Sequence, residues 1–87
     1  MMAVDWSIAW SDLRELDGDA WDTEWERLRD LWRAQYLKEF VDYALGRSWD
    51  RENAEVWSDE IVDDALVECQ GDPVEVARKD VHACELE

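Results

Sequence analysis

The stretch of sequence that decides the fold is residues 21–46, WDTEWERLRDLWRAQYLKEFVDYALG. Its apolar residues recur every three or four positions and form two adjacent stripes. The first stripe is Trp21, Trp25, Leu28, Trp32, Tyr36 and Phe40, and the second is Leu31, Ala34, Leu37, Val41 and Leu45. Two neighbouring stripes give a helix a wide apolar arc, which favours contacts on more than one side. We therefore predict one long central helix of roughly 25 residues, about 37 Å in length at the usual rise.

Helices are also predicted on both sides of the central one. Upstream, one helical face carries the apolar residues Trp6, Ala9, Trp10, Leu13 and Leu16. Gly18 is expected to stop this first helix, because glycine accepts the left-handed conformation that ends helices. Asp19 or Asp22 is expected to cap the start of the central helix, and Gly46 is expected to end it.

Downstream of the central helix, a short helix is expected from Ser48 or Asp50, followed by a further helix that Ser58 caps. The buried face of that further helix is Ile61, Val62, Ala65, Leu66 and Cys69. Asp72-Pro73-Val74-Glu75 predicts another helix start, with a capping Asp, Pro at the first helical position and Glu at the third. The predicted fold class is therefore all-α, a small bundle of four to five helices around one long Trp-rich helix, in a single domain of residues 1–87.

The chain carries a formal net charge of −15 over 87 residues, and this charge is unevenly distributed. Residues 5–26, which we call the first acidic segment, hold eight acidic residues and one basic residue. Residues 50–72, which we call the second acidic segment, hold nine acidic residues and one basic residue. Residues 27–47 hold five basic and three acidic residues. Charge at this density opposes compaction, so a partner or an unusual solvent is expected to account for it. An apolar content of 47% with ten aromatic side chains excludes a disordered chain.

The acidic residues stand closest together between residues 59 and 68. Three like-charged pairs lie four residues apart, and each costs a helix about 0.2–0.5 kcal/mol: Asp59/Asp63, Glu60/Asp64 and Asp64/Glu68. No Lys or Arg occurs from residue 52 to residue 77. Five carboxylates over this length give about one charge per 3 Å of helix axis, close to the roughly 3.4 Å between phosphates along one DNA strand. Such a helix could occupy a cationic groove that otherwise binds a phosphate backbone.

The acidity is also compatible with two origins that involve no partner. A run of charge on a helix is usually its solvated face. Alternatively, a high-salt cytoplasm selects acidic, lysine-poor proteins, and this chain has two Lys against seven Arg. Salt would screen the self-repulsion, since the Debye length falls to about 3 Å at 1 M. Both origins stay open at the level of the sequence.

The seven tryptophans divide into a predicted core group and a predicted surface pair. The core group, which follows the helical spacing, is Trp6, Trp10, Trp21, Trp25 and Trp32. Trp49 and Trp57 lie in or beside the second acidic segment and are expected to be partly exposed. Because Trp is a favoured interface anchor, either of them could contact a partner.

No pattern in the sequence indicates catalysis, a cofactor or a metal. His82 has no nucleophile pattern around it, and solvated acids lack the enclosed site that a general acid needs. Cys69, His82 and Cys84 could approach one another as zinc ligands, but both cysteines fall on apolar stripes, where a thiol acts as a small hydrophobe. We predict a protein that is not an enzyme, with reduced thiols.

The sequence also bears on location and on partner class. No apolar run is long enough to cross a bilayer and no signal-peptide pattern opens the chain, so a cytoplasmic location is expected, the host cytoplasm for a phage-encoded chain. The acidity argues against direct binding of nucleic acid or of anionic lipid, since both attract Lys and Arg.

In composition and size the chain resembles the small acidic inhibitors of phages and mobile elements, the DNA-mimic class that includes anti-CRISPR and anti-restriction proteins. The resemblance covers charge, length and helical character and rests on no motif. It implies binding to the nucleic-acid channel of a host nuclease or surveillance complex, which is blocked by occupancy.

The leading hypothesis is a non-catalytic inhibitor that evades host defence by binding a basic, nucleic-acid-handling protein or ribonucleoprotein complex through acidic helix faces. The predicted partner-binding residues are Asp59, Glu60, Asp63, Asp64, Glu68, Glu52, Glu55, Trp57, Asp17, Asp19 and Asp22. The alternatives are an acidic structural domain of a salt-adapted organism and an immunity or antitoxin protein that neutralises a toxin. Whether the chain forms a homodimer is left open.

Overall fold

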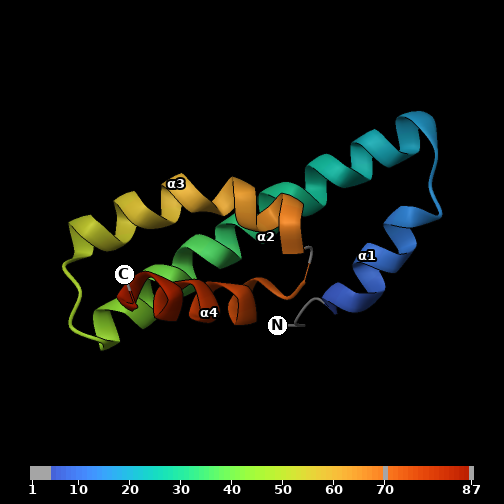
Figure 1. Ribbon diagram of the computed structural model, residues 1–87. Helices are drawn as coiled ribbons and strands as arrows, with labels where there is room; N and C mark the ends of the chain where they lie inside the picture. Colours follow the sequence, from blue (N-terminus) through green and yellow to red (C-terminus); the bar gives the residue numbers. More distant parts are fainter. Residues whose placement is uncertain (1–4, 70, 87) are drawn as a thin grey trace.

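The computed structural model describes residues 5–69 and 71–86, without the side chains of Glu68 and Cys69. The described residues form four helices, α1 (Trp6–Arg14), α2 (Gly18–Gly46), α3 (Arg51–Cys69) and α4 (Pro73–Glu85) (Figure 1). Both α3 and α4 pack along α2, and α1 packs against its N-terminal part (Figure 1). The molecule is elongated, with extents of 43 × 26 × 19 Å. An all-helical fold around one long central helix is therefore confirmed.

The central helix α2 follows the first predicted apolar stripe over most of its length. Its buried residues recur every four positions and are Leu28, Trp32, Tyr36, Phe40 and Ala44. The helix ends at Gly46, as predicted, but begins at Gly18. Asp17 occupies the N-cap position and its side chain makes no capping hydrogen bond, so the prediction that Asp19 or Asp22 caps this helix is wrong.

Helix α1 and its joint to α2 differ in their bounds from the prediction. Asp5 caps α1, its Oδ1 accepting hydrogen bonds from the backbone nitrogens of Ser7 and Ile8 at 3.1 and 3.3 Å. The helix ends at Arg14, which is earlier than predicted. Gly18 does adopt the expected left-handed conformation, with φ of +59°, but as the first residue of α2. Only glycine takes this conformation without strain, and it reverses the chain direction here.

Helix α3 is continuous, so the prediction of two shorter helices that meet at Ser58 is wrong. Ser58 lies inside α3 with 1% of its surface exposed. Its hydroxyl donates to the Glu55 carbonyl at 2.9 Å, which satisfies the buried oxygen without ending the helix. Ala54, Val62 and Leu66 share the buried face with it.

Helix α4 starts where the sequence predicts. Asp72 is the N-cap and accepts a hydrogen bond from the Val74 backbone nitrogen at 2.8 Å, with Pro73 as the first helical residue. Ion pairs and hydrogen bonds then fix α4 along α2. These contacts are Tyr36–Asp80 at 2.6 Å, Arg78–Glu39 at 2.9 Å, Tyr43–His82 at 2.7 Å and Arg47–Glu85. The hydrogen bond to Glu85 raises the pKa of Arg47 above its ordinary value.

Two buried tryptophans join three parts of the chain at one carbonyl. The indole Nε1 of Trp10 in α1 and that of Trp32 in α2 both donate to the Gly71 carbonyl oxygen, at 3.2 and 2.8 Å. We call this pair of hydrogen bonds the Gly71 contact. It ties α1 and α2 to the turn between α3 and α4, and so fixes where α3 ends relative to α2.

Four tryptophans of α1 and α2 lie next to one another in the order Trp6, Trp10, Trp25 and Trp21, and we call them the Trp ladder. Their ring centroids lie 5.4 Å apart for Trp6–Trp10, 6.1 Å for Trp10–Trp25 and 5.7 Å for Trp21–Trp25. Trp6 and Trp10 are buried, whereas Trp21 keeps 36% of its surface exposed. The prediction that Trp21 belongs to the core is therefore wrong, because no third helix covers this end of α2 within the described ranges (Figure 1).

Candidate functional site

The solvent face of α3 gathers most of the predicted partner-binding residues. Those that lie on this helix are Glu52, Glu55, Trp57, Asp59, Glu60, Asp63, Asp64 and Glu68. Glu68 has its side chain outside the described part of the chain, and the side chains of the other seven are exposed. They point outward because Ala54, Ser58 and Val62, spaced four residues apart, take the side that faces the core.

The described carboxylates of residues 59–64 form two rows on α3. Asp59 and Asp63 lie one turn apart on one flank, and Glu60 and Asp64 lie one turn apart on the next flank. Within a row the charges are about 6 Å apart along the axis, so each row has roughly half the charge density of one DNA strand. The helix therefore presents a broad anionic face rather than a single line of charge.

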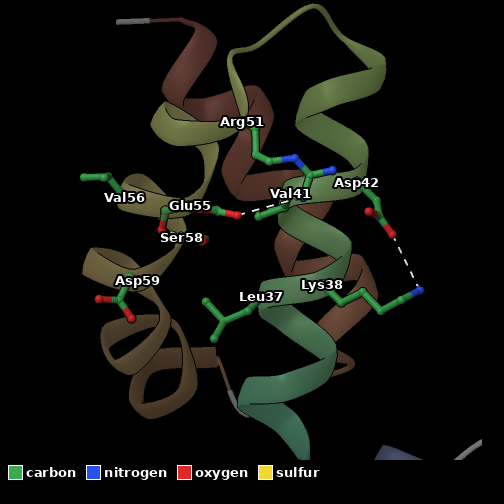
Figure 2. A pocket seen from close by; sticks show the side chains of 9 residues that line it. All are labelled: Leu37, Lys38, Val41, Asp42, Arg51, Glu55, Val56, Ser58 and Asp59. Carbon is green, nitrogen blue, oxygen red and sulfur yellow. Dashed lines mark hydrogen bonds and ion pairs between the residues drawn. The ribbon is translucent and has the colours of Figure 1, made fainter.

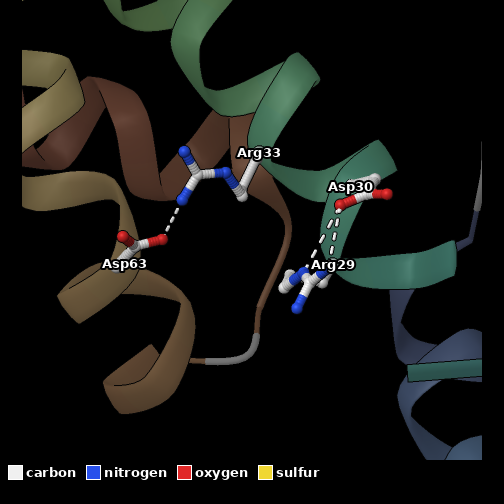
Figure 3. A network of polar contacts seen from close by, with 4 residues as sticks. All are labelled: Arg29, Asp30, Arg33 and Asp63. Carbon is white, nitrogen blue, oxygen red and sulfur yellow. Dashed lines mark hydrogen bonds and ion pairs between the residues drawn. The ribbon is translucent and has the colours of Figure 1, made fainter. Parts of the chain in front are cut away.

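One of these carboxylates has a basic partner on another helix. Arg33 of α2 forms an ion pair with Asp63 of α3 (Figure 3). Nearby, Arg29 contacts the adjacent Asp30 at 3.4 Å (Figure 3). The α3 sequence alone gives no sign of a cation near Asp63, because its partner stands 30 residues away in the chain.

Among the acidic residues of α3 whose side chains the structure describes, four keep uncompensated charge. Glu55 lies 3.9 Å from Arg51 and Asp63 pairs with Arg33. Within the described part of the chain, no Lys, Arg or His lies within 4.0 Å of the remaining carboxylates, which are Glu52, Asp59, Glu60 and Asp64. All four are exposed, so they are free to attract a cationic surface.

Large apolar side chains stand among these charges. Val56 is 50% exposed, Trp57 is 40% exposed and Val67 is 70% exposed. Trp57 was predicted from the sequence, but Val56 and Val67 were missed. Their spacing of eleven residues, three helical turns, places both on the side opposite the buried stripe. We call Val56, Trp57, Val67 and the four uncompensated carboxylates the α3 face.

The predicted contact residues of the first acidic segment lie far from the start of α3. Asp17, Asp19 and Asp22 stand at the start of α2, at the opposite end of the molecule from the start of α3 (Figure 1). Asp22 is eleven residues from Arg33, which pairs with Asp63 of α3, and this spacing corresponds to about 16 Å of helix. The structure does not bring the two predicted groups of acids together into one surface.

A surface groove of about 600 Å³ is lined by residues of α2 and α3, on one flank of the α3 face (Figure 2). Leu37 and Val41 of α2 lie on its apolar side, and Val56 stands at its α3 edge. The charged lining residues are of both signs, with Lys38, Arg51, Asp42, Glu55 and Asp59. Lys38 and Asp42 pair at 3.5 Å, so the groove has a mixed rim with little preference for the sign of a ligand.

A smaller hollow of about 220 Å³, which we call the Trp pocket, lies at the start of α3 and the end of α4. Its lining residues are Trp49, Asp50, Asn53, Trp57 and Cys84. Trp49 is half-buried and forms a T-shaped pair with Phe40, with ring centroids 5.9 Å apart. Core packing thus fixes one wall of the pocket, while the exposed Trp57 forms another.

Among the described residues, no group of three His, Cys, Asp or Glu side chains is placed to hold a metal ion. No described helix is both long and apolar enough to span a membrane. Comparisons with protein-family models, with curated proteins and with solved structures gave no match.

Proposed function

We propose that this protein is a non-catalytic inhibitor that binds a basic, nucleic-acid-handling protein and occupies the surface where that partner binds nucleic acid. The α3 face makes the principal contact. The observation that carries the proposal is the composition of this face, four uncompensated carboxylates interspersed with three exposed large apolar side chains. The acids at the start of α2 form a separate, second contact.

Each half of this composition has a physical role in binding. Carboxylates in excess steer a cationic partner toward the face and raise the rate of association, an effect that added salt weakens. Exposed Val and Trp side chains supply the apolar area that stabilises the complex once it has formed. A protein acidic for solubility in brine needs only the charges, whereas exposed Val and Trp side chains beside the charges supply contact area for a partner.

The proposal is tested by capture and displacement. The protein is immobilised and incubated at 0.1 M salt with nuclease-treated lysate of its source organism, and bound proteins are eluted with duplex DNA and identified by mass spectrometry. We expect DNA to release a small set of nucleic-acid-binding proteins, because the inhibitor and DNA compete for one surface.

Two variants with the same change of charge locate the contact. The α3 variant carries E52Q, D59N, E60Q and D64N, and the matched control carries D12N, E15Q, E26Q and E75Q, four exposed acids outside the predicted contact residues. Asp63 is kept, because its loss would leave Arg33 without its partner on α3.

We expect the α3 variant to lose roughly tenfold or more of the DNA-eluted protein, as four weak ion contacts disappear together. The control variant should lose much less. Equal losses in the two variants would show that binding depends on net charge and not on the α3 face. Captured proteins that duplex DNA cannot displace would contradict competition for a nucleic-acid site. Far-UV circular dichroism establishes that both variants keep their helices.

A further inference from the structure

The lining of the Trp pocket combines aromatic side chains with polar side chains that can accept hydrogen bonds. Trp49 and Trp57 supply the walls, and Asp50 and Asn53 contribute a carboxylate and a side-chain amide oxygen. Asp50 is exposed and, among the described residues, has no Lys, Arg or His within 4.0 Å. Glu52, another uncompensated carboxylate, follows two residues later.

The size of the pocket limits what it can take. Its volume of about 220 Å³ falls below the roughly 300–1,000 Å³ of small-molecule sites and suits one long side chain. The nearest cation in the sequence, Arg51, lines the α2–α3 groove instead and pairs there with Glu55 at 3.9 Å. Arg51 therefore does not neutralise the carboxylate that lines the Trp pocket.

We propose that the Trp pocket binds an arginine side chain of the partner. A planar guanidinium stacks on an indole face, and Trp is the aromatic side chain that attracts cations most strongly. The donors of the guanidinium match the oxygen acceptors of Asp50 and Asn53. An apolar side chain would gain the aromatic contact but would desolvate the Asp50 carboxylate without a partner.

This inference deepens the proposed function, on which it rests only for the basic character of the partner. The pocket adjoins the α3 face, since Trp57 belongs to both. An arginine anchored there would orient the partner along α3, whereas the carboxylates alone give attraction without a fixed register. Arg and Trp are also the residues most often found at the energetic centre of interfaces.

The test uses the intact protein and a defined probe, Nα-acetyl-arginine amide. Its ureido analogue, Nα-acetyl-citrulline amide, has nearly the same shape and no charge, and Nα-acetyl-lysine amide carries the charge without the plane. Binding is followed by ¹H–¹⁵N correlation spectra of the seven tryptophan indole groups. Single Trp-to-Phe variants assign the signals.

We expect the arginine probe to shift the Trp49 and Trp57 indole signals with a dissociation constant on the order of 1–10 mM, and to leave that of the exposed Trp21 in place. The two analogues should bind at least about threefold more weakly. Equal shifts with the citrulline probe would show that the pocket does not recognise the charge. Equal shifts with the lysine probe would show that it does not recognise the planar shape of the guanidinium. Either result, or a Trp21 shift as large as that of Trp57, overturns the inference.

A pair of variants separates the pocket from general attraction to an acidic protein. Asp50→Asn removes the carboxylate from the pocket lining and keeps a residue suited to the position before a helix. Asp12→Asn removes one exposed charge from α1. We expect at least about threefold weaker arginine binding in the first and no change in the second, and equal affinities would contradict the role of Asp50.

The two proposals fail separately. Probe binding does not depend on any partner. If the arginine probe shifts no indole signal while duplex DNA still displaces captured proteins, only the arginine-site proposal is refuted. If the probe shifts the indole signals but duplex DNA displaces no captured protein, the inhibitor proposal is refuted and the arginine-binding pocket stands.

Discussion

The Gly71 contact gives a prediction in which two substitutions cost more together than separately. Trp10 and Trp32 both donate to one carbonyl oxygen, at 3.2 and 2.8 Å. A carbonyl has two lone pairs, so replacing either donor leaves it with one hydrogen bond. Replacing both leaves it with none from these indoles. The second loss therefore carries a cost that neither single loss carries.

The magnitudes follow from burial. Trp10→Phe removes one neutral hydrogen bond, worth about 1 kcal/mol, and because Trp10 is buried it also leaves a cavity of roughly 40 Å³ that costs about 1 kcal/mol, for about 2 kcal/mol in all. Trp32 is fully buried, so Trp32→Phe also leaves a cavity of roughly 40 Å³ that costs about 1 kcal/mol more, for about 2 kcal/mol in all. The unsatisfied carbonyl adds a further penalty of about 1 kcal/mol to the double variant, at the low end of its range because Gly71 is half-buried.

Urea denaturation followed by far-UV circular dichroism measures these free energies without relying on tryptophan emission. With a slope of about 1 kcal/mol per M, each kcal/mol moves the midpoint by about 1 M. The control cycle pairs Trp32→Phe with Trp6→Phe, because Trp6 donates to Gln35 at 3.2 Å. That cycle should be additive within about 0.5 kcal/mol. Additivity within that margin for Trp10 and Trp32 as well would refute the idea that the two indoles share one acceptor.

Three further predictions concern local contacts and solvent. Asp72→Ala removes the side-chain cap of α4 and should lower the free energy of unfolding by about 1 kcal/mol in urea denaturation, with Asp72→Asn close to wild type; equal losses would contradict capping. Tyr36→Phe removes a buried donor to the Asp80 carboxylate and should cost about 2 kcal/mol in the same assay, whereas a loss under about 0.5 kcal/mol would show that this bond adds little. Thermal melts should show a chain already helical at 0.1 M KCl whose midpoint rises toward 1 M as salt screens the net charge of −15; a chain unfolded at 0.1 M would favour salt adaptation.

The sequence predicts the fold well where packing is periodic. The stripe through Leu28, Trp32 and Phe40 is buried as expected, because a helix that meets neighbours on two sides buries a wide apolar face. Local signals at helix ends are weaker, since the same residue types serve several roles. Gly18 takes the left-handed conformation that it was expected to take, yet at the start of a helix. Ser58 could cap a helix or bury its hydroxyl inside one, and tertiary burial decides.

The candidate site is predictable in part for the same reason. Outward-facing acids of α3 follow from the buried stripe, and so does the exposure of Trp57. The pairing of Asp63 with Arg33 and the place of Asp50 in the Trp pocket depend on how α3 packs against α2 and α4. Contacts between residues so distant in the chain leave no local pattern. Trp21 is exposed because α1 is short and covers only one side of the α2 N-terminal part.

The Trp ladder gives the protein an optical property of its own. Its four indoles stand 5.4 to 6.1 Å apart from ring to ring, close enough for their electronic transitions to couple. Trp6 and Trp10 belong to α1, and Trp21 and Trp25 belong to α2, so the coupling between the two pairs exists only while the helices are docked. The docking of α1 therefore contributes to the circular dichroism of the unlabelled chain, so a rearrangement at this end of the molecule changes the aromatic signal without a dye.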